Sequence, residues 1–287
     1  MKKHWLLLIL IVAIFLLLCW SLWWSNYGLK TVRYTVGGMS LPEGFNGYHI
    51  VQLSDLHSVS LGEENGRLLK AIRAEKPDII VMTGDMVSRY DEDFSVTLAL
   101  CGALAEEYPV YYIRGNHEEG LATADWESYR AALAASKVQV LDNETVQLTA
   151  ENGDRINLTG LWYKLDYYHK YASHYRPVTE ETMYTILGEA PEGYNILLAH
   201  NPNYFPVYAA WGADVTFCGH IHGGMIWLPV LGGILSPETI LFPEYDGGSY
   251  QIGDKTMILS RGLGRGRMGI RLFNPPELVC VTLTREE

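Results

Sequence analysis

Short apolar runs that end in glycine and polar residues recur along the chain. The clearest, from Asp78 to Asp85, is too short for a helix and too apolar for a surface strand, so it predicts a buried parallel strand that ends at Gly84-Asp85. Taken alone, a Gly-Asp pair is more often only a turn after a core strand. Side chains at the carboxyl ends of parallel strands converge on one crevice, so the other strand ends decide whether Asp85 belongs to a site.

Helical and extended patterns alternate in the first half of the chain and predict an α/β fold. An apolar strand from Tyr48 leads to Asp55, and the helical spacing from Leu68 to Ala74 before Pro77 predicts the crossover helix of a βαβ unit. Further helices are predicted over residues 96–107, 126–135 and 180–187, and further strands over 31–36, 110–114, 138–141, 146–149, 156–160, 195–200, 213–219, 256–260 and 278–283. After residue 138 the pattern shifts toward consecutive strands, and no repeat or linker divides the chain after its first segment.

The first segment has a different pattern, because Trp5 to Trp24 is a run of twenty residues without a charge. At about 1.5 Å per residue it is long enough to cross a hydrocarbon core of roughly 30 Å. A cleaved secretory signal is the main alternative, but the run is longer than a usual signal core of about 7 to 15 residues, and no small-x-small site follows it. We therefore expect an uncleaved membrane anchor over residues 1–28 and one catalytic domain over residues 29–287.

The charges beside this run indicate its orientation only weakly. Lys2 and Lys3 precede the run while Lys30 and Arg33 follow it, so the positive-inside rule meets a nearly symmetrical count. A short basic tail kept inside, with the body of the chain outside, is the simpler interpretation. It predicts a single-pass protein of the cell membrane with an extracytoplasmic catalytic domain.

Composition narrows the classes of partner. A formal net charge of −11 argues against a surface for nucleic-acid backbones, where a basic face is expected, so no nucleic-acid partner is predicted. The cysteines outside the anchor, at positions 101, 218 and 280, each lie in an apolar context. They predict buried thiols and offer no disulfide framework that would indicate an oxidising compartment.

Five strand ends carry residues that are able to bind metal. They are Asp55-x-His57, Gly84-Asp85, Gly115-Asn116-His117, His200 and Gly219-His220-x-His222. In an extended Asp-x-His or His-x-His segment both side chains point to the same face, which suits metal ligation. Carboxylate, imidazole and amide oxygen without thiolate favour Mn, Fe or Zn over a soft-metal site, and these ligands are too many for one ion.

In this order the motifs resemble the signature of the calcineurin-like metallophosphoesterases: Asp-x-His, Gly-Asp, Gly-Asn-His-Asp/Glu, a separate His and Gly-His-x-His. The resemblance spans about Tyr48 to Pro276, and Arg261-Gly-Leu-Gly with Pro275-Pro-Glu277 looks like the membrane-associated YkuE and YaeI branch of the family. It implies a four-layer αββα sandwich of two mixed β-sheets flanked by helices.

The same resemblance implies a role for each residue. One divalent ion is expected on Asp55, His57 and His222, the other on Asn116, His200 and His220, with Asp85 between them. Two such ions hold phosphate oxygens and lower the pKa of a shared water, so that hydroxide attacks phosphorus in line. His117 is expected to be the catalytic residue that contacts the phosphate and protonates or stabilises the leaving oxygen.

Other polar residues near these motifs carry weaker predictions. Glu118 is expected to orient the neighbouring imidazole or a ligand histidine. Arg114 and the arginines at 261, 265 and 267 are able to clamp phosphate oxygens, although arginine beside glycine loops is usually a solvated turn. The stretch from Tyr163 to Tyr175 is interpreted as a loop insertion with a substrate role, or as an aromatic surface that packs under the next helix or touches lipid headgroups.

These observations predict a membrane-anchored two-metal phosphohydrolase, with phosphodiesters as the first choice of substrate class. A pyrophosphohydrolase of lipid or nucleotide-sugar intermediates is the close alternative, because an anchor would hold the site near headgroups and near lipid-linked or envelope-derived substrates. A noncatalytic scaffold of the same fold would be expected to lack ligands, and none is lost here. Ile221 and Met225 stand where this branch commonly has Thr and Gln, which leaves substrate preference open.

Overall fold

Two mixed β-sheets pack face to face in the computed structural model, which describes residues 2–168, 174–224, 226–228, 230–237, 240–265, 269 and 271–285. In spatial order, the first sheet consists of β1 (Lys30–Gly37), β14 (Glu277–Thr284), β2 (His49–Leu53), β3 (Ile79–Met82), β4 (Val110–Tyr112) and β5 (Gln139–Val140). The second consists of β12 (Gly248–Ile252), β13 (Lys255–Leu259), β9 (Val215–Cys218), β8 (Asn195–Ala199), β7 (Arg155–Leu161) and β6 (Thr145–Thr149).

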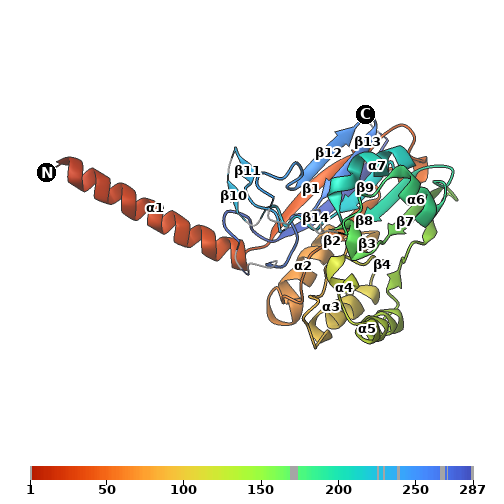
Figure 1. The fold of residues 1–287 in the computed structure, drawn as a ribbon, viewed down its shortest axis with the longest axis horizontal. Coiled ribbons are helices and arrows are strands. Elements are labelled where there is room, and N and C mark those ends of the chain that lie inside the picture. The colour runs from red at the N-terminus through yellow and green to blue at the C-terminus, as the bar shows by residue number, and fades with distance from the viewer. Residues whose placement is uncertain are drawn as a thin grey trace.

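Helices cover the outer face of each sheet (Figure 1). The first sheet is covered by α2 (Gly66–Glu75), α3 (Ser95–Ala105) and α5 (Thr123–Ala135), and the second by α6 (Glu180–Leu187) and α7 (Phe205–Trp211). The remaining elements are α1 (Lys2–Tyr27), α4 (Asn116–Glu119), β10 (Trp227–Leu228), β11 (Gly232–Gly233) and the 3-10 turns Glu43–Phe45, Glu63–Asn65, Leu165–Tyr167 and Pro202–Tyr204. The four-layer αββα sandwich is thereby confirmed.

Strand β3 shows why the apolar runs have no polar face. Its alternate residues enter two different cores: Ile79 and Val81 pack between the sheets, whereas Ile80 and Met82 pack under the helices. All four side chains are buried, as is expected for a parallel strand covered on both faces. Burial on both faces leaves only the strand ends for polar side chains.

The second half of the chain differs from the expected succession of neighbouring strands. Only the β6–β7 and β12–β13 pairs are antiparallel in the second sheet, whereas β7, β8, β9 and β13 are parallel. The chain returns between them through α6 and through α7, a helix that the sequence did not predict. Pro202 and Pro206 make its segment resemble a loop, yet proline fits the first turn of a helix, where its missing N–H has no partner to lose.

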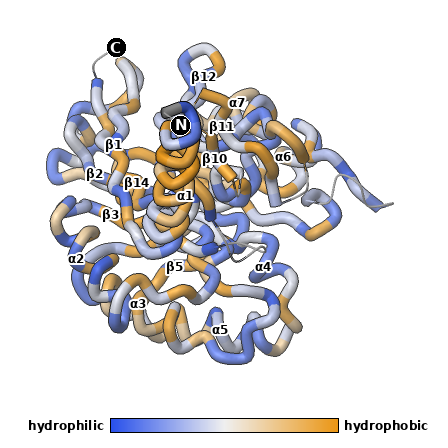
Figure 2. Tube along the Cα trace, turned by 90° about the vertical axis from the view of Figure 1, so that its left-hand side faces the viewer, coloured by the Kyte–Doolittle hydropathy of each residue, from blue (hydrophilic) through white to orange (hydrophobic). Residues whose placement is uncertain are grey.

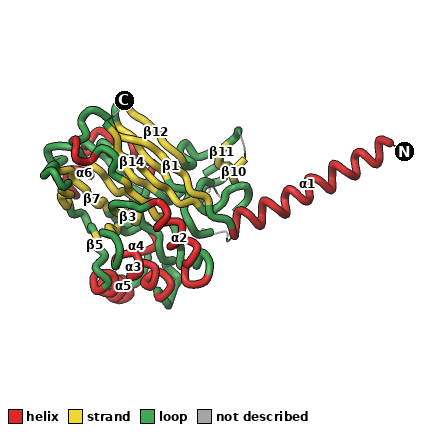
Figure 3. Tube along the Cα trace, turned by 180° about the vertical axis from the view of Figure 1, so that it is seen from behind, coloured by secondary structure: helices red, strands yellow, loops and turns green. Residues whose placement is uncertain are grey.

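Helix α1 extends away from the two sheets, as Figures 1 and 3 show. Between Lys3 and Tyr27 it is long and apolar enough to cross a membrane, a property that a signal sequence near the amino terminus shares.

Candidate metal centre

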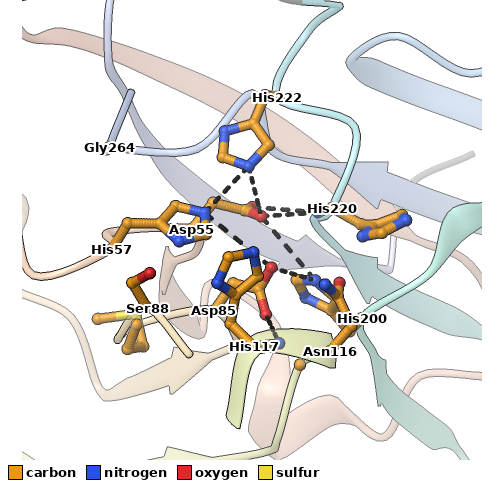
Figure 4. A network of polar contacts seen from close by, with 12 residues as sticks. Asp55, His57, Asp85, Ser88, Asn116, His117, His200, His220, His222 and Gly264 are labelled. Atoms are coloured by element: carbon orange, nitrogen blue, oxygen red, sulfur yellow. Dashed lines mark hydrogen bonds and ion pairs between the residues drawn. The ribbon is translucent and has the colours of Figure 1, made fainter. Parts of the chain in front are cut away.

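The predicted ligands lie where parallel strands of both sheets end (Figure 4). The segments after β2, β3 and β4 bring Asp55 with His57, Asp85, and Asn116 with His117, while those after β8 and β9 bring His200, and His220 with His222. Because β2, β3 and β4 are parallel to one another, and so are β8 and β9, their carboxyl ends meet at one edge of the sandwich. Every residue predicted for the two ions therefore reaches one place.

The backbone that presents these side chains is not extended, which corrects the reasoning from alternation. Left-handed φ angles occur at Asp55 (52°), His57 (49°), Asp85 (53°), His220 (76°) and His222 (55°). Such angles are uncommon for residues with a Cβ, and they concentrate at functional sites where the surrounding structure stabilises them. Tight turns, rather than a strand face, thus aim both members of each pair at the centre.

Two glycines in the motifs permit the close approach of the strand ends. Gly84 has a φ of 88°, and a Cβ there would lie 2.5 Å from the Gly115 nitrogen and 2.9 Å from His200 Nδ1. A Cβ on Gly115 would in turn overlap the Asp85 carboxylate. The Gly-Asp and Gly-Asn pairs are therefore needed for packing at the centre itself.

One cluster of ligands contains Asp55, His57 and His222, whose donor atoms all lie within 4.8 Å of one another. His222 Nε2 is 3.4 Å from Asp55 Oδ1 and 3.1 Å from His57 Nε2. Burial lowers the pKa of His57 to about 3 and holds that of His222 well below its usual range, so both imidazoles are neutral. Two neutral ring nitrogens and a carboxylate oxygen that face one another match the donor set of a divalent transition metal.

A second cluster contains Asp85, His200 and His220. His200 Nε2 lies 3.2 Å from Asp85 Oδ2, and His200 Nδ1 lies 2.6 Å from the Thr83 carbonyl oxygen. A hydrogen bond from Nδ1–H to that carbonyl directs Nε2 toward the centre, as is usual for metal-binding histidine. Burial lowers the pKa of His200, but the adjacent Asp85 carboxylate outweighs it and raises this pKa to about 10, so a cation bound there would displace a proton from Nε2. Asp85 Oδ2 is also 4.0 Å from His57 Nε2, so this carboxylate lies between the two clusters.

Asn116 adds an amide to the second cluster. Its side-chain oxygen is placed 2.8 Å from His220 Nδ1, 3.2 Å from His200 Nε2 and 3.3 Å from Asp85 Oδ2, which are all acceptors. Reversing the amide would turn these contacts into hydrogen bonds and would let its oxygen accept from the Arg89 guanidinium at 2.9 Å, whereas a cation bound among these atoms would favour the placed orientation.

The two carboxylates at the centre are buried, since Asp55 is 0% and Asp85 2% exposed. Buried negative charge is costly unless a partner compensates it, and burial raises the pKa of Asp55. Divalent cations would supply the compensation, and the donor set of nitrogen and oxygen without sulfur fits Mn, Fe or Zn. The residues present therefore fit the metal ions that the sequence predicted.

His117 lies at the edge of the centre. Its ring centroid is 4.5 Å from that of His57, and its Nδ1 accepts a 3.2 Å hydrogen bond from the Arg89 main-chain N–H. Burial lowers the pKa of His117, and the neutral ring must carry its proton on Nε2 because Nδ1 is an acceptor. His117 also forms a third group of possible metal ligands with His57 and Asp85, so both a hydrogen-bond donor and a potential ligand stand beside the other two clusters.

Glu118 acts on the main chain rather than on an imidazole, which corrects the prediction of its contacts. Its carboxylate accepts hydrogen bonds from the N–H groups of Asp85 (2.8 Å), Met86 (2.7 Å) and Gly115 (2.9 Å) and from the Tyr112 hydroxyl (2.6 Å). These bonds fix the turn that carries Asp85 against the turn that carries Asn116. Glu118 is 1% exposed and thus forms an internal brace for the centre.

The described arginines that were predicted as phosphate clamps make contacts with other side chains of the protein. Arg114 pairs with Asp142 through two hydrogen bonds of 2.9 and 2.6 Å, and its guanidinium stacks 4.3 Å from the ring centroid of Trp126 and 4.0 Å from that of Trp162. Arg261 stacks on a tryptophan at 4.5 Å, and Arg265 lies 5.4 Å from a tyrosine of α1. Residue 267, like residue 225, lies outside the described residues.

The tyrosine-rich stretch supports the packing interpretation where the structure describes it. Tyr163 and Tyr168 are buried in the core under α6 and α7, and the Tyr168 ring lies 5.3 Å from the ring of His220. Residues 169–173 lie outside the described residues.

Two residues that sequence reasoning missed support His222. The Asn274 amide donates a 2.6 Å hydrogen bond to the His222 carbonyl, and Arg271 lies 3.5 Å from His222 Nδ1. Arg271 is 1% exposed and donates to the carbonyls of Gly264 and Arg261 at 2.6 and 2.7 Å. The sequence did offer one indication of Arg271, because it is a charged residue between the apolar residues Ile270 and Leu272.

Comparison with known proteins agrees with this geometry. A family model described as calcineurin-like phosphoesterase matches residues 48–224. The uncharacterized metallophosphoesterase YkuE of Bacillus subtilis is 28% identical over 260 residues, which cover 89% of this chain and 85% of the relative. The phosphodiesterase YaeI of Escherichia coli is 26% identical over 243 residues, which cover 82% of each chain.

A further relative is the UDP-2,3-diacylglucosamine pyrophosphatase LpxG of Chlamydia trachomatis. It is 28% identical over an alignment 318 residues long, gaps included, which covers 89% of this chain and 90% of the relative. The family model spans most of both sheets and includes every strand end that contributes to the centre. The chain therefore belongs to the calcineurin-like phosphoesterase family and is a metal-dependent phosphoester hydrolase.

Proposed function

We propose that this hydrolase is a two-metal phosphodiesterase that helix α1 holds at the cell membrane. The observation that carries the proposal is the position of Asp85, whose Oδ2 lies 3.2 Å from His200 Nε2 and 4.0 Å from His57 Nε2. Those histidines belong to different ligand clusters, and a single ion would leave one buried cluster without a cation. A carboxylate between two clusters is the expected arrangement for a pair of ions.

In this proposal Asp55, His57 and His222 would hold one ion, Asn116, His200 and His220 would hold the other, and Asp85 would serve both. When bound, two divalent cations, Mn, Zn or Fe by the donor set, polarise the phosphoryl group and lower the pKa of a water molecule. The protein keeps these ligands fixed through the hydrogen bond from His200 to Thr83 and the brace formed by Glu118.

His117 is proposed as the residue that serves the leaving oxygen. Its Nδ1 accepts from the Arg89 N–H, so Nε2–H is the group that donates toward the substrate. Donation at that atom stabilises the charge that develops on an alkoxide as the P–O bond breaks.

Hydrolysis of a diphosphate is the second candidate, because α1 would place the centre near headgroups and the relative LpxG is named a pyrophosphatase. Product analysis separates the two reactions. Purified full-length protein should release a phosphomonoester and an alcohol from a phosphodiester. Release of two phosphomonoesters from a lipid or nucleotide-sugar diphosphate, with no turnover of diesters, would instead assign the pyrophosphohydrolase.

We further propose that residues 1–28 form an uncleaved anchor and that residues 29–287 form the catalytic domain outside the cytoplasm. Support for retention comes from Ser21 and Ser25 of α1, which are 1% and 0% exposed because they pack against the domain. Protease added to intact cells should remove the domain. Digestion only after lysis would reverse the orientation.

A further inference from the structure

The segment from β10 to residue 242 exposes two sequence-adjacent pairs of large apolar side chains. Val230 is 102%, Leu231 62%, Leu241 65% and Phe242 60% exposed, and these residues lie on the β10–β11 hairpin and the turn that follows it. We call this segment, as far as it is described, the apolar hairpin. Outside it and α1, the exposed large apolar side chains of the described residues are single ones on separate elements: Met39, Tyr90, Tyr184 and Ile252. An exposed apolar cluster of this kind marks a contact surface.

Helix α1 is attached firmly to the domain beside this hairpin. The Ser21 hydroxyl accepts a 2.9 Å hydrogen bond from the Phe273 N–H, and the Ser25 hydroxyl accepts a 3.0 Å bond from the Asn274 N–H. Both serines are buried although the rest of the helix is largely exposed. The helix therefore holds the domain in a defined orientation, unlike a flexible tether.

Residues 271–274, which bond to α1 and are called the docking segment, also carry the base of the apolar hairpin. Asn26 exchanges hydrogen bonds of 3.1 and 3.3 Å with the main chain of Arg271. The next residue, Leu272, pairs with Ile226 and accepts a 3.1 Å bond from the Trp227 N–H. Figures 1, 2 and 3 accordingly place β10 and β11 beside the end of α1 that meets the sheets.

The position of the docking contact along α1 indicates its depth in a membrane. Ser21 precedes Tyr27 by six residues, which is about 9 Å along the helix axis. Trp20, Trp23 and Tyr27 are exposed in the same stretch, and such rings lie at headgroup depth. The domain surface that packs on Ser21 must then reach the headgroup region, and the hairpin beside it reaches the same level.

We propose that the apolar hairpin is a second membrane contact, whose occupant is the bilayer that α1 crosses. Only four residues separate His222 from the start of the hairpin at Trp227, and Asn274, which also bonds to α1, donates to the His222 carbonyl. Membrane contact at the hairpin thus sets the metal centre close to the bilayer surface. The substrate is then an amphiphile whose phosphodiester lies among the headgroups. This inference about the substrate rests on the proposed phosphodiesterase function, whereas the membrane contact does not.

Lipid quenching tests the contact independently of catalysis. In the full-length chain, Cys19→Ser removes the exposed thiol and leaves Cys101, Cys218 and Cys280 buried. A fluorophore is attached to Leu231→Cys or, as the control, to Tyr184→Cys on α6, and each protein is placed in vesicles of phosphatidylglycerol and phosphatidylcholine. Nitroxide on the lipid headgroups should quench the probe at 231 and leave the probe at 184 bright.

If nitroxide lipids reduced the emission of the probe at 231 no more than that of the probe at 184, the membrane contact would be overturned. Disulfide cross-linking of Leu231→Cys between two chains without lipid quenching would also overturn it, because a second copy would then cover the hairpin.

The substrate class is tested with two esters that share a leaving group. Methyl 4-nitrophenyl phosphate is soluble, whereas hexadecyl 4-nitrophenyl phosphate enters the same vesicles. Leu231→Ser with Phe242→Ser should raise KM for the hexadecyl ester several-fold and leave kcat/KM for the methyl ester unchanged, and Tyr184→Ser should change neither. If the double variant had the same KM as the wild-type protein for the hexadecyl ester, the substrate inference would be refuted. No turnover of either ester by the wild-type protein would refute the phosphodiesterase itself, while the quenching result stands by itself.

Discussion

Glu118→Gln is expected to destabilise the metal centre although Glu118 contacts no ligand side chain. One carboxylate oxygen accepts from the Asp85 and Gly115 N–H groups at 2.8 and 2.9 Å. The other accepts from the Met86 and Val87 N–H groups at 2.7 and 3.3 Å and from the Tyr112 hydroxyl at 2.6 Å. Glutamine keeps one oxygen, so in either orientation at least two main-chain N–H groups must face an NH₂ group. Two buried donors then lose their acceptor.

Each buried donor without a partner costs about 1–3 kcal/mol, so the substitution should cost about 2–6 kcal/mol of folding stability. That is a large share of the roughly 5–15 kcal/mol that stabilises a typical protein. For a domain of this size about 1 kcal/mol corresponds to 2–4 °C, which predicts a fall in Tm of about 4–24 °C. The turn that carries Asp85 should loosen first, because most of the lost bonds hold it.

The assay is thermal unfolding of the full-length protein, with metal content measured on the same sample. Glu127→Gln on α5 is the matched control, because Glu127 is exposed. It should shift Tm by no more than about 2 °C, as surface substitutions usually do. A Tm for Glu118→Gln within about 2 °C of the wild type, with full metal content, would refute the bracing role.

Three further predictions concern the site. Arg114→Ala should lower Tm by removing the stack on Trp126 and Trp162 while leaving KM unchanged. A raised KM at unchanged Tm would instead indicate that Arg114 binds the substrate phosphate. His117→Ala should keep its metals and lose about 10² to 10⁴ in kcat/KM on alkyl esters but much less on nitrophenyl esters, whose leaving group needs no proton. Equal losses on both would assign His117 to phosphate positioning. Removal of metal with a chelator should lower Tm, because a ligand at a hundred times its Kd stabilises by about 2.7 kcal/mol, and Mn²⁺ should restore it. An unchanged Tm would contradict buried metal ligands.

The strand ends could be predicted from the sequence because their signal is local. An apolar run such as Ile79–Met82 fixes a buried strand, and the Gly84-Asp85 pair directly after it fixes where the strand stops. The convergence of His200 with Asp85 was implied by the family resemblance, because these residues follow strands of different sheets, β8 and β3, and the structure places their side-chain atoms 3.2 Å apart. Residue type and position along the chain were sufficient for the strand ends, and the order of the motifs was needed for their assembly.

The contacts between distant segments could not be predicted in the same way. Arg114 looked like a phosphate ligand by position, but its partner Asp142 comes 28 residues later in the chain. Glu118 was assigned to a histidine because the two are neighbours in sequence, whereas its acceptor oxygens reach the turn after β3, 33 residues earlier. Backbone conformation was equally hidden, since the left-handed φ of His57 depends on packing rather than on residue type.

The metal content of the purified full-length protein, measured together with turnover of a nitrophenyl phosphodiester, tests the central claim most directly. The wild type should hold two divalent ions per chain at full activity. Asp85→Asn should lose activity and metal together, because Asp85 lies between both ligand clusters, whereas Asp125→Asn at an exposed position of α5 should change neither. Near-normal turnover of Asp85→Asn with two bound ions, or a fully active wild type with one ion, would contradict the account.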